Sequence, residues 1–238
     1  MEIRFTQLQC SSSSVTVDIN DWVIEPQQSW GVFSTEGDVG ALLGQLLTQQ
    51  IDAQTLTYSG DIIGVTPASV ALVSLLEQQS LLEAILEQDD SESLGYTDPK
   101  TTVFGVVFNQ CHDNDLTHQL LQQLDLTHLS LSPFAQLSTG EGRRVMLARA
   151  VATQVPFLVL DEPYAGLDVA HRQTLTEYLQ QLSQTKQILV VVSREEDMPD
   201  WIEHVAMFSH GKLDSMMTKL QWDNHPVIAQ LTAQAGQQ

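Results

Sequence analysis

The chain has 238 residues, of which 42% are hydrophobic and 17% are charged, so it has enough apolar surface for a packed core and is not an intrinsically disordered protein. Its 30 acidic residues outnumber the 10 basic ones and give a formal net charge of -20. Most of the surface would therefore repel phosphate backbones and anionic lipid, and direct nucleic-acid binding is not expected.

Short β-branched runs alternate with longer helical patterns, which is typical of a parallel sheet with crossover helices. We predict strands over residues 3–8, 15–18, 30–33, 61–65, 103–108, 157–160, 188–192 and 205–208. The uninterrupted apolar runs at 157–160 and 188–192 predict central strands that are covered on both faces. Apolar spacing predicts helices over 72–86, 116–124 and 145–151. The expected fold class is α/β.

The predicted helices suggest how the chain is organised. We expect one domain over residues 1–238, with a core of about 1–66 and 133–215, a helical subdomain of about 67–132 and a tail of about 216–238. No apolar run approaches the roughly 18 residues that a membrane span needs, so membrane insertion is not expected. Cys10 and Cys111 match no metal spacing, which favours a reduced, cytoplasmic setting, and His112, His118 and His128 form no ligand pattern.

Two adjacent carboxylates follow the predicted strand at 157–160. Asp161 and Glu162 stand at the carboxyl end of this strand, the edge where open parallel sheets bind ligands. In a phosphate-handling site the first would hold Mg²⁺ and the second would orient an attacking water. Taken alone, the motif is more simply an Asp-Glu-Pro turn after a strand.

A second motif lies 24 residues before Asp161 and begins the arginine-bearing helix. It consists of Leu137, Ser138, Thr139, Gly140 and Glu141. The N-terminus of a helix offers outward N–H groups and a favourable dipole to a phosphate, and the small residues allow close approach. Capping of the helix by Ser138 or Thr139 is compatible with that role, so both interpretations stay open. Arg143, Arg144 and Arg149 follow within seven residues and would suit either an anion site or a solvated face.

Together these motifs resemble the ABC ATPase cassette, a P-loop NTPase-like fold with a mostly parallel sheet, N-terminal antiparallel strands and a helical subdomain. Residues 137–168 resemble the signature, its helix, the Walker B strand and the D-loop (Gly166, Leu167 and Asp168), in that order and spacing. The SHGKL stretch at 209–213 is similar to a turn near the end of the cassette. The chain looks most similar to the first, degenerate cassette of the twin-cassette molybdenum-transport ATP-binding or photorepair proteins.

The resemblance fails at the Walker A loop, which should read G-x-x-x-x-G-K-[ST]. The aligned segment runs from Ser34 to Ala41 and places Ser34 and Val39 at the two glycines, Gly40 at the lysine and Ala41 at the hydroxyl. Of the glycines in the loop only the permissive Gly37 remains. No lysine precedes Lys100 to replace the missing cation, so binding of ATP in this loop should fail.

Three further features of the family are missing from this chain, and their absence also argues against ATP binding in its own Walker A loop. Arg194 stands where the family has its switch histidine, and neither Cys10 nor Ser11 can stack on adenine as the family's aromatic does. No Q-loop glutamine is identifiable near 65–69, and Gln78 and Gln79 are interpreted as exposed helix positions.

In the family, each nucleotide lies between the Walker A loop of one cassette and the signature of another. The resemblance therefore implies that this chain supplies its signature in trans to a second cassette, fused or separate, which would bind most of the ATP and Mg²⁺. Molybdate-type transport through a membrane permease, at the cytoplasmic side of the inner membrane, is the expected context. A non-catalytic regulatory or scaffolding module and a DNA-repair-linked ATPase half are the alternatives. The isolated chain is expected to be an inactive or very weak ATPase.

Overall fold

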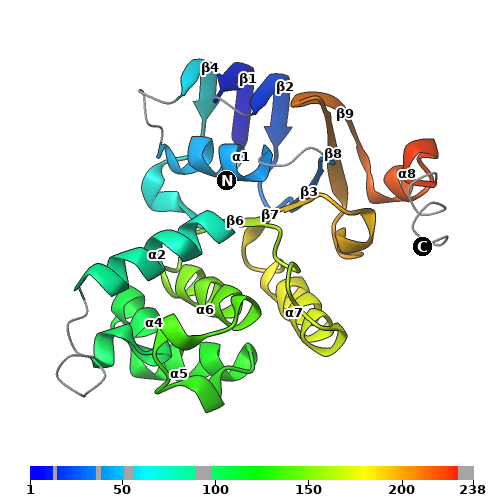
Figure 1. Ribbon diagram of the computed structural model, residues 1–238. Helices are drawn as coiled ribbons and strands as arrows, with labels where there is room; N and C mark the ends of the chain where they lie inside the picture. Colours follow the sequence, from blue (N-terminus) through cyan, green and yellow to red (C-terminus); the bar gives the residue numbers. More distant parts are fainter. Residues whose placement is uncertain (13–14, 36–38, 51–55, 89–97, 230–238) are drawn as a thin grey trace.

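The computed structural model describes residues 1–12, 15–35, 39–50, 56–88 and 98–229. The described strands form one nine-stranded sheet in the order β4-β1-β2-β9-β8-β3-β7-β6-β5 (Figure 1). Their bounds are β1 Ile3–Ser11, β2 Thr16–Ile24, β3 Trp30–Phe33, β4 Thr57–Ile63, β5 Val70–Val73, β6 Phe157–Asp161, β7 Gln187–Val192, β8 His204–Ser209 and β9 Lys212–Thr218. β1 pairs antiparallel with β2 and β4, whereas β3, β5, β6, β7 and β8 run parallel.

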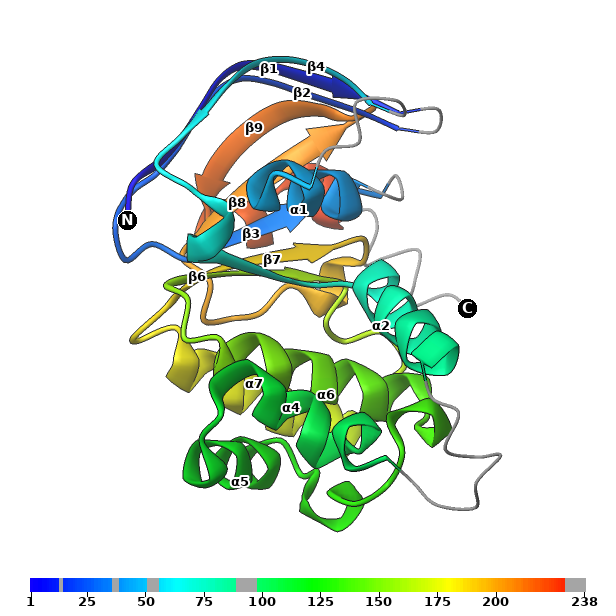
Figure 2. The same ribbon diagram turned by 90° about the vertical axis from the view of Figure 1, so that its left-hand side faces the viewer.

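Helix α1 (Val39–Thr48) lies between the antiparallel N-terminal strands and the central strands (Figure 2). One of its faces contributes Leu43, Leu46 and Leu47 to a core shared with both groups of strands. Trp22 and Phe5 stack in the same core, with ring centroids 4.9 Å apart. This packing holds the N-terminus of α1 near the carboxyl ends of β3, β6 and β7, where the candidate site lies.

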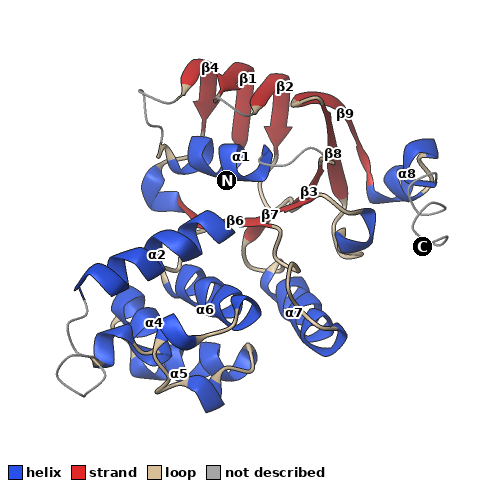
Figure 3. Cartoon of the chain, viewed as in Figure 1, coloured by secondary structure: helices blue, strands red, loops and turns tan. Residues whose placement is uncertain are grey.

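The remaining described helices are α2 Leu75–Gln88, α4 Val103–Cys111, α5 Asn114–Gln123, α6 Thr139–Ala152, α7 Val169–Leu182 and α8 Lys219–Asp223. On the opposite face of the central strands lie α6 and α7, with α4 and α5 packed beyond α6, whereas α8 lies beside β9 (Figure 3). Single 3-10 turns lie at Pro67–Ser69, Pro99–Thr101, Thr127–Leu129, Phe134–Gln136 and Glu195–Asp197. A second core forms between α4, α5, α6, α7 and the sheet, and it includes the fully buried Leu158, Ile188 and Val190.

The structure confirms the α/β fold, the antiparallel N-terminal strands and the central strands predicted at 157–160 and 188–192. The strand predicted at 103–108 is wrong, because this segment is helix α4, capped by the Thr102 hydroxyl, which accepts from the N–H of Gly105 at 3.1 Å. Val103, Val106 and Val107 are buried at the spacing of one helix face, and packing here overrides the strand preference of valine.

Two further elements differ from expectation. The helix predicted at 72–86 begins later, because β5 occupies Val70–Val73 and pairs parallel with β6 before α2 starts at Leu75. β9 was not predicted, since its alternating half-buried and exposed residues are mostly polar. In the described ranges no helix is long and apolar enough to cross a membrane, and those residues contain no group of His, Cys, Asp and Glu suited to a metal ion.

Candidate functional site

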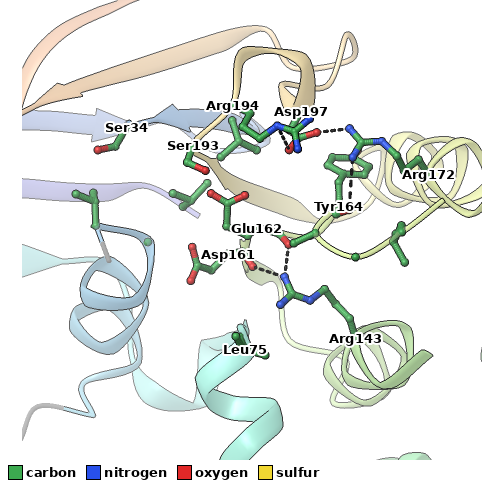
Figure 4. Close-up of a pocket in the computed structure, with 17 residues that line it drawn as sticks. Ser34, Leu75, Arg143, Asp161, Glu162, Tyr164, Arg172, Ser193, Arg194 and Asp197 are labelled. Carbon is green, nitrogen blue, oxygen red and sulfur yellow. Dashed lines mark hydrogen bonds and ion pairs between the residues drawn. The ribbon is translucent and has the colours of Figure 1, made fainter. Parts of the chain in front are cut away.

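A cavity of about 560 Å³ opens at the carboxyl ends of β3, β6 and β7 (Figure 4). Its wall brings together residues that the sequence predicted to share a site: Ser34, Val39, Gly40, Asp161, Glu162, Gly166, Leu167 and Arg194. The wall also includes Leu75, Arg143, Tyr164, Arg172 and Asp197. The carboxyl ends of β3 and β6 and the N-terminus of α1 thus meet at one cavity, as expected for the ligand sites of parallel sheets.

The N-terminus of α1 forms one side of this cavity. Val39 and Gly40 are buried there, and Ser34 is buried just after β3, with its N–H donating to Val192 O at 3.1 Å. A Cβ added at Gly40 would lie 1.9 Å from Oδ1 of Asp161, so only glycine fits at this position while the carboxylate stays where it is. Ala41 is the next residue of α1, and the predicted loop residue Gly37 lies outside the described residues.

Asp161 ends β6, and Glu162 follows it with a left-handed backbone, at a φ of 50°. This conformation is uncommon for a residue with a side chain, and it is held by a hydrogen bond from the Glu162 N–H to Val191 O at 2.9 Å. Arg143 reaches from α6 and donates to the carbonyl oxygens of both residues, with 3.4 Å to Asp161 O. The predicted carboxylate pair is therefore anchored by backbone contacts from two neighbouring elements.

Arg143 is 5% exposed, and its guanidinium lies beside the backbone carbonyl oxygens of Asp161 and Glu162 (Figure 4). Burial lowers the pKa of Arg143, and the charges of Asp161 and Glu162 act in the opposite direction. An arginine stays protonated under these conditions, so the cavity wall carries a fixed positive charge at Arg143. The sequence had singled out Arg143 only as a member of an arginine cluster.

Arg194 lines the cavity just after β7 and Ser193, where the sequence placed it, but its charge is paired locally. It forms ion pairs with Glu196 and with Asp197, at 4.0 Å for the latter. Asp197 is 5% exposed and also pairs with Arg172, whose guanidinium lies 5.3 Å from the ring centre of Tyr164. Figure 4 shows this group along the upper wall, beside Glu162.

Leu75 supplies an apolar side chain to the cavity from the first residue of α2, two residues after β5 ends. The stretch at 65–69, in which the sequence shows no Q-loop glutamine, precedes β5, whereas Leu75 follows it. Gln78 is half-buried, not exposed as predicted, and its Nε2 lies 3.4 Å from Thr139 O.

Ser138 is the N-cap of α6, one of the two candidates, Ser138 and Thr139, that the sequence left open. The Glu141 N–H donates to the Ser138 hydroxyl at 3.3 Å, and the Ser138 N–H and hydroxyl donate to Oε2 of Glu141 at 2.8 and 2.7 Å. These hydrogen bonds from Ser138 lower the pKa of Glu141. Leu137 is half-buried before the cap, while Ser138 and Thr139 are exposed.

The predicted signature and D-loop residues are neighbours within this chain. A Cβ at Gly140 would lie 3.0 Å from Gly166 O and 3.1 Å from a methyl group of Leu167. Gly166 has a φ of +77°, which suits glycine, and Asp168 then caps α7 by accepting from the His171 N–H at 2.9 Å. Hydrogen bonds from His171 lower the pKa of Asp168.

Comparison with known proteins connects this geometry to a family. Residues 33–165 match the family described as ABC transporter. The Escherichia coli K12 ABC transporter ATP-binding protein ModF is 26% identical over 223 residues, which cover 92% of this chain and 44% of ModF. The Haemophilus influenzae molybdate import ATP-binding protein MolC is 34% identical over 85 residues, 36% of this chain and 34% of MolC. The chain thus spans less than half the length of these relatives.

Among solved structures, a nucleotide-free ATP-binding cassette from an ABC transporter superposes with a TM-score of 0.68 at 14% identity, covering 98% of this chain and 99% of that one. At this identity the likeness speaks for the fold alone. Cassettes of the matched family bind ATP with Mg²⁺ and pair with a second cassette and a permease. Since the family match covers more than half of the chain, and the fold agrees with it, this chain belongs to the ABC transporter family as an ATP-binding cassette domain.

Proposed function

We propose that this chain is the signature-donating half of an ATP-driven cassette pair, and that its own pocket does not bind Mg-ATP. The observation that carries the proposal is the contact between Gly40 and Asp161. Residue 40 is glycine where the family has a lysine, and a Cβ there would overlap the Asp161 carboxylate in its present position.

The residues around the pocket fit Mg-ATP poorly in other respects. No lysine is among the described residues that line it, Ala41 offers no hydroxyl to Mg²⁺, and Leu75 brings an apolar side chain. Without a bound cation, a carboxylate about 4 Å from a phosphate charge costs about 4 kcal/mol at an effective dielectric of 20. This cost applies to a triphosphate without Mg²⁺, because with the metal bound Asp161 would be one of its ligands. The sequence adds Glu36 and Asp38, which lie outside the described residues.

The residues at the N-terminus of α6 support a role in the other half-site of a cassette pair. Ser138 and Thr139 are exposed at the N-terminus of α6, and the buried Gly140 packs against Gly166, two residues before Asp168, the N-cap of α7. A helix N-terminus of this kind favours an anion, here the γ-phosphate of ATP held by the partner. Two copies of this chain would pair an intact signature with an unsuited pocket at both sites, so the proposed partner is a different cassette.

The transport context is also a proposal. ModF and MolC are named as ATP-binding proteins, and the name of MolC specifies molybdate import. We infer that this chain acts with a permease for a molybdate-type oxyanion and lies at the cytoplasmic face of the inner membrane through that partner.

A second candidate function is a regulatory or scaffolding module that uses the cassette fold without completing an ATP site. The position of Glu141 favours it. Its carboxylate already accepts hydrogen bonds from the N–H and hydroxyl of Ser138. The N-terminus of α6, which would bind the phosphate of the partner's ATP, therefore already carries a negative charge from this chain.

ATPase turnover of the complex between this chain and its partner cassette separates the two candidates. Replacing Ser138 by arginine would put a long side chain where the partner's ATP is proposed to meet the N-terminus of α6. ATPase turnover should then fall by about a hundredfold, because the loss of one oxyanion or phosphate contact lowers the rate by about that factor. Thr218→Arg is the matched control, because Thr218 makes the same capping box with Gln221 at the start of α8. Equal turnover of the Ser138 and Thr218 variants would favour the regulatory module and refute signature donation.

A further inference from the structure

Gln78 of α2 contacts the first turn of α6, the helix whose N-terminus would meet the partner's ATP. We propose that Gln78 is a positioning residue for this turn: it holds the signature residues in place by a hydrogen bond to Thr139 and by packing against Gly142. This inference rests on the proposed function, because it concerns the position of the same signature residues. Gln78 acts only through α6 and is assigned no contact with nucleotide.

The hydrogen bond comes from the side-chain amide of Gln78. Its Nε2 donates to Thr139 O at 3.4 Å, although the two residues are 61 positions apart in the sequence. Thr139 directly follows the N-cap Ser138, so this carbonyl belongs to the turn that presents the Ser138 hydroxyl. The partner also fixes the orientation of the amide, because a carbonyl oxygen can accept a hydrogen bond only from the Nε2 end. α2 packs against α6 here (Figures 1 and 2).

Gly142 leaves the space that this amide occupies. A Cβ added at Gly142 would lie 2.3 Å from Nε2 and 3.1 Å from Cδ of Gln78. Gly142 is buried in the first turn of α6, and its N–H donates to Ser138 O at 2.9 Å. A methyl group at residue 142 would therefore displace the end of the Gln78 side chain from Thr139 while leaving the helix backbone in place.

Stability alone does not account for a glutamine at this position. Oε1 of Gln78 is buried and has no hydrogen-bond partner among the residues that the structure describes. A buried acceptor without a partner opposes folding, whereas an apolar side chain of similar length would fill the same space without that penalty. The contribution specific to the amide is its donor, which is directed at the signature turn. Gln79, the next residue of α2, is exposed and provides a matched control.

ATPase turnover of the complex with the partner cassette tests this role. Gln78→Met keeps the length of the side chain and removes the donor, so kcat should fall by roughly tenfold, less than the hundredfold that a misplacement of about 1 Å can cost. KM for ATP should stay within about twofold, because the partner holds the nucleotide. Gln79→Met should leave both constants unchanged.

Thermal unfolding of the isolated chain separates positioning from a purely structural role. The Tm of Gln78→Met should not fall, because the hydrogen bond that is lost is exposed and the buried unpaired oxygen is removed with it. A purely structural role would instead lower the Tm and leave kcat per folded complex unchanged.

Gly142→Ala tests the same contact from the other helix. Its methyl group should displace the amide, so kcat should fall by a factor similar to that of Gln78→Met. In a Gln78→Ala background the amide is absent, and Gly142→Ala should change kcat by less than about twofold. Amide hydrogen exchange of the isolated chain gives a readout without the partner: the N–H groups of Glu141 and Gly142 should exchange faster in Gln78→Met than in Gln79→Met.

The inference is overturned if Gln78→Met and Gln79→Met have the same kcat or the same exchange at Glu141 and Gly142, or if Gly142→Ala lowers kcat equally in both backgrounds. Failure of the proposed function gives a different result, because Ser138→Arg would then leave turnover unchanged. If Ser138→Arg lowers turnover while the two glutamine variants remain equal, signature donation stands and only the role of Gln78 is refuted.

Discussion

Gly40→Ala is the smallest change that challenges the close contact in the pocket. The added methyl group would lie 1.9 Å from Oδ1 of Asp161, 2.7 Å from its Cγ and 3.0 Å from Cγ1 of Val191. Overpacking of this kind costs about 1–3 kcal/mol, and alanine in place of glycine in a helix returns up to about 1 kcal/mol. The net cost is therefore at most about 3 kcal/mol, and at about 2–4 °C of Tm per kcal/mol for a chain of this size we expect a loss of up to roughly 12 °C.

The assay is urea and thermal unfolding of the variant beside two companions. Gly44→Ala is the control on the same helix, because its methyl group would meet only the apolar side chain of Leu72, with Cδ1 at 2.6 Å, and no part of Asp161. In the Asp161→Ala background, the cost of Gly40→Ala should fall to within about 0.5 kcal/mol of zero, because the group it collides with is gone. An equal cost of Gly40→Ala in both backgrounds would refute the contact as the cause.

Three further changes follow from the local geometry. Ser138→Ala removes the cap of α6 and should cost about 1 kcal/mol in unfolding experiments, whereas Ser138→Asp should retain most of the stability. Hydrogen bonds lower the pKa of Glu141 in the folded chain, so its contribution to the free energy of unfolding is complete above about pH 4.3 and is lost as the pH falls through the lowered pKa. In Glu141→Gln, the free energy of unfolding should therefore fall less steeply below that pH. Burial raises the pKa of Tyr178 to about 12, so up to roughly 3 kcal/mol of stability, complete below pH 10, should be lost as the pH rises from 10 to 12, and Tyr178→Phe should abolish that decline.

The strands could be predicted where burial on both faces makes the sequence continuously apolar. β6 and β7 are of this kind, and so are the helices whose apolar residues follow a clear helical spacing, such as α5 and α6. The segment at 103–108 could not be predicted, because a short run rich in valine suits either a buried strand or a buried helix, and only packing against α6 decides between them. β5 was missed for a related reason, since four apolar residues run directly into the leucines of α2.

The parts of the candidate site that could be predicted are those whose residues are consecutive in the sequence. The N-cap role of Ser138 and the position of Asp161 and Glu162 after a strand both follow from local sequence. The role of Arg143 does not, because its partners Asp161 and Glu162 lie 18 and 19 residues away and the contact exists only once α6 packs on β6. The pairing of Arg194 with Asp197 was equally hidden, since a charged turn after a strand is consistent with many orientations.

The most direct test of the central claim is titration calorimetry of Mg-ATP into the isolated wild-type chain. A pocket in which Gly40 replaces a lysine and Asp161 lies against it should show no saturable heat at millimolar nucleotide. Saturable binding with a micromolar Kd, abolished by changes at residues 39–41, would show that this chain holds ATP in its own pocket and would contradict signature donation as its sole contribution.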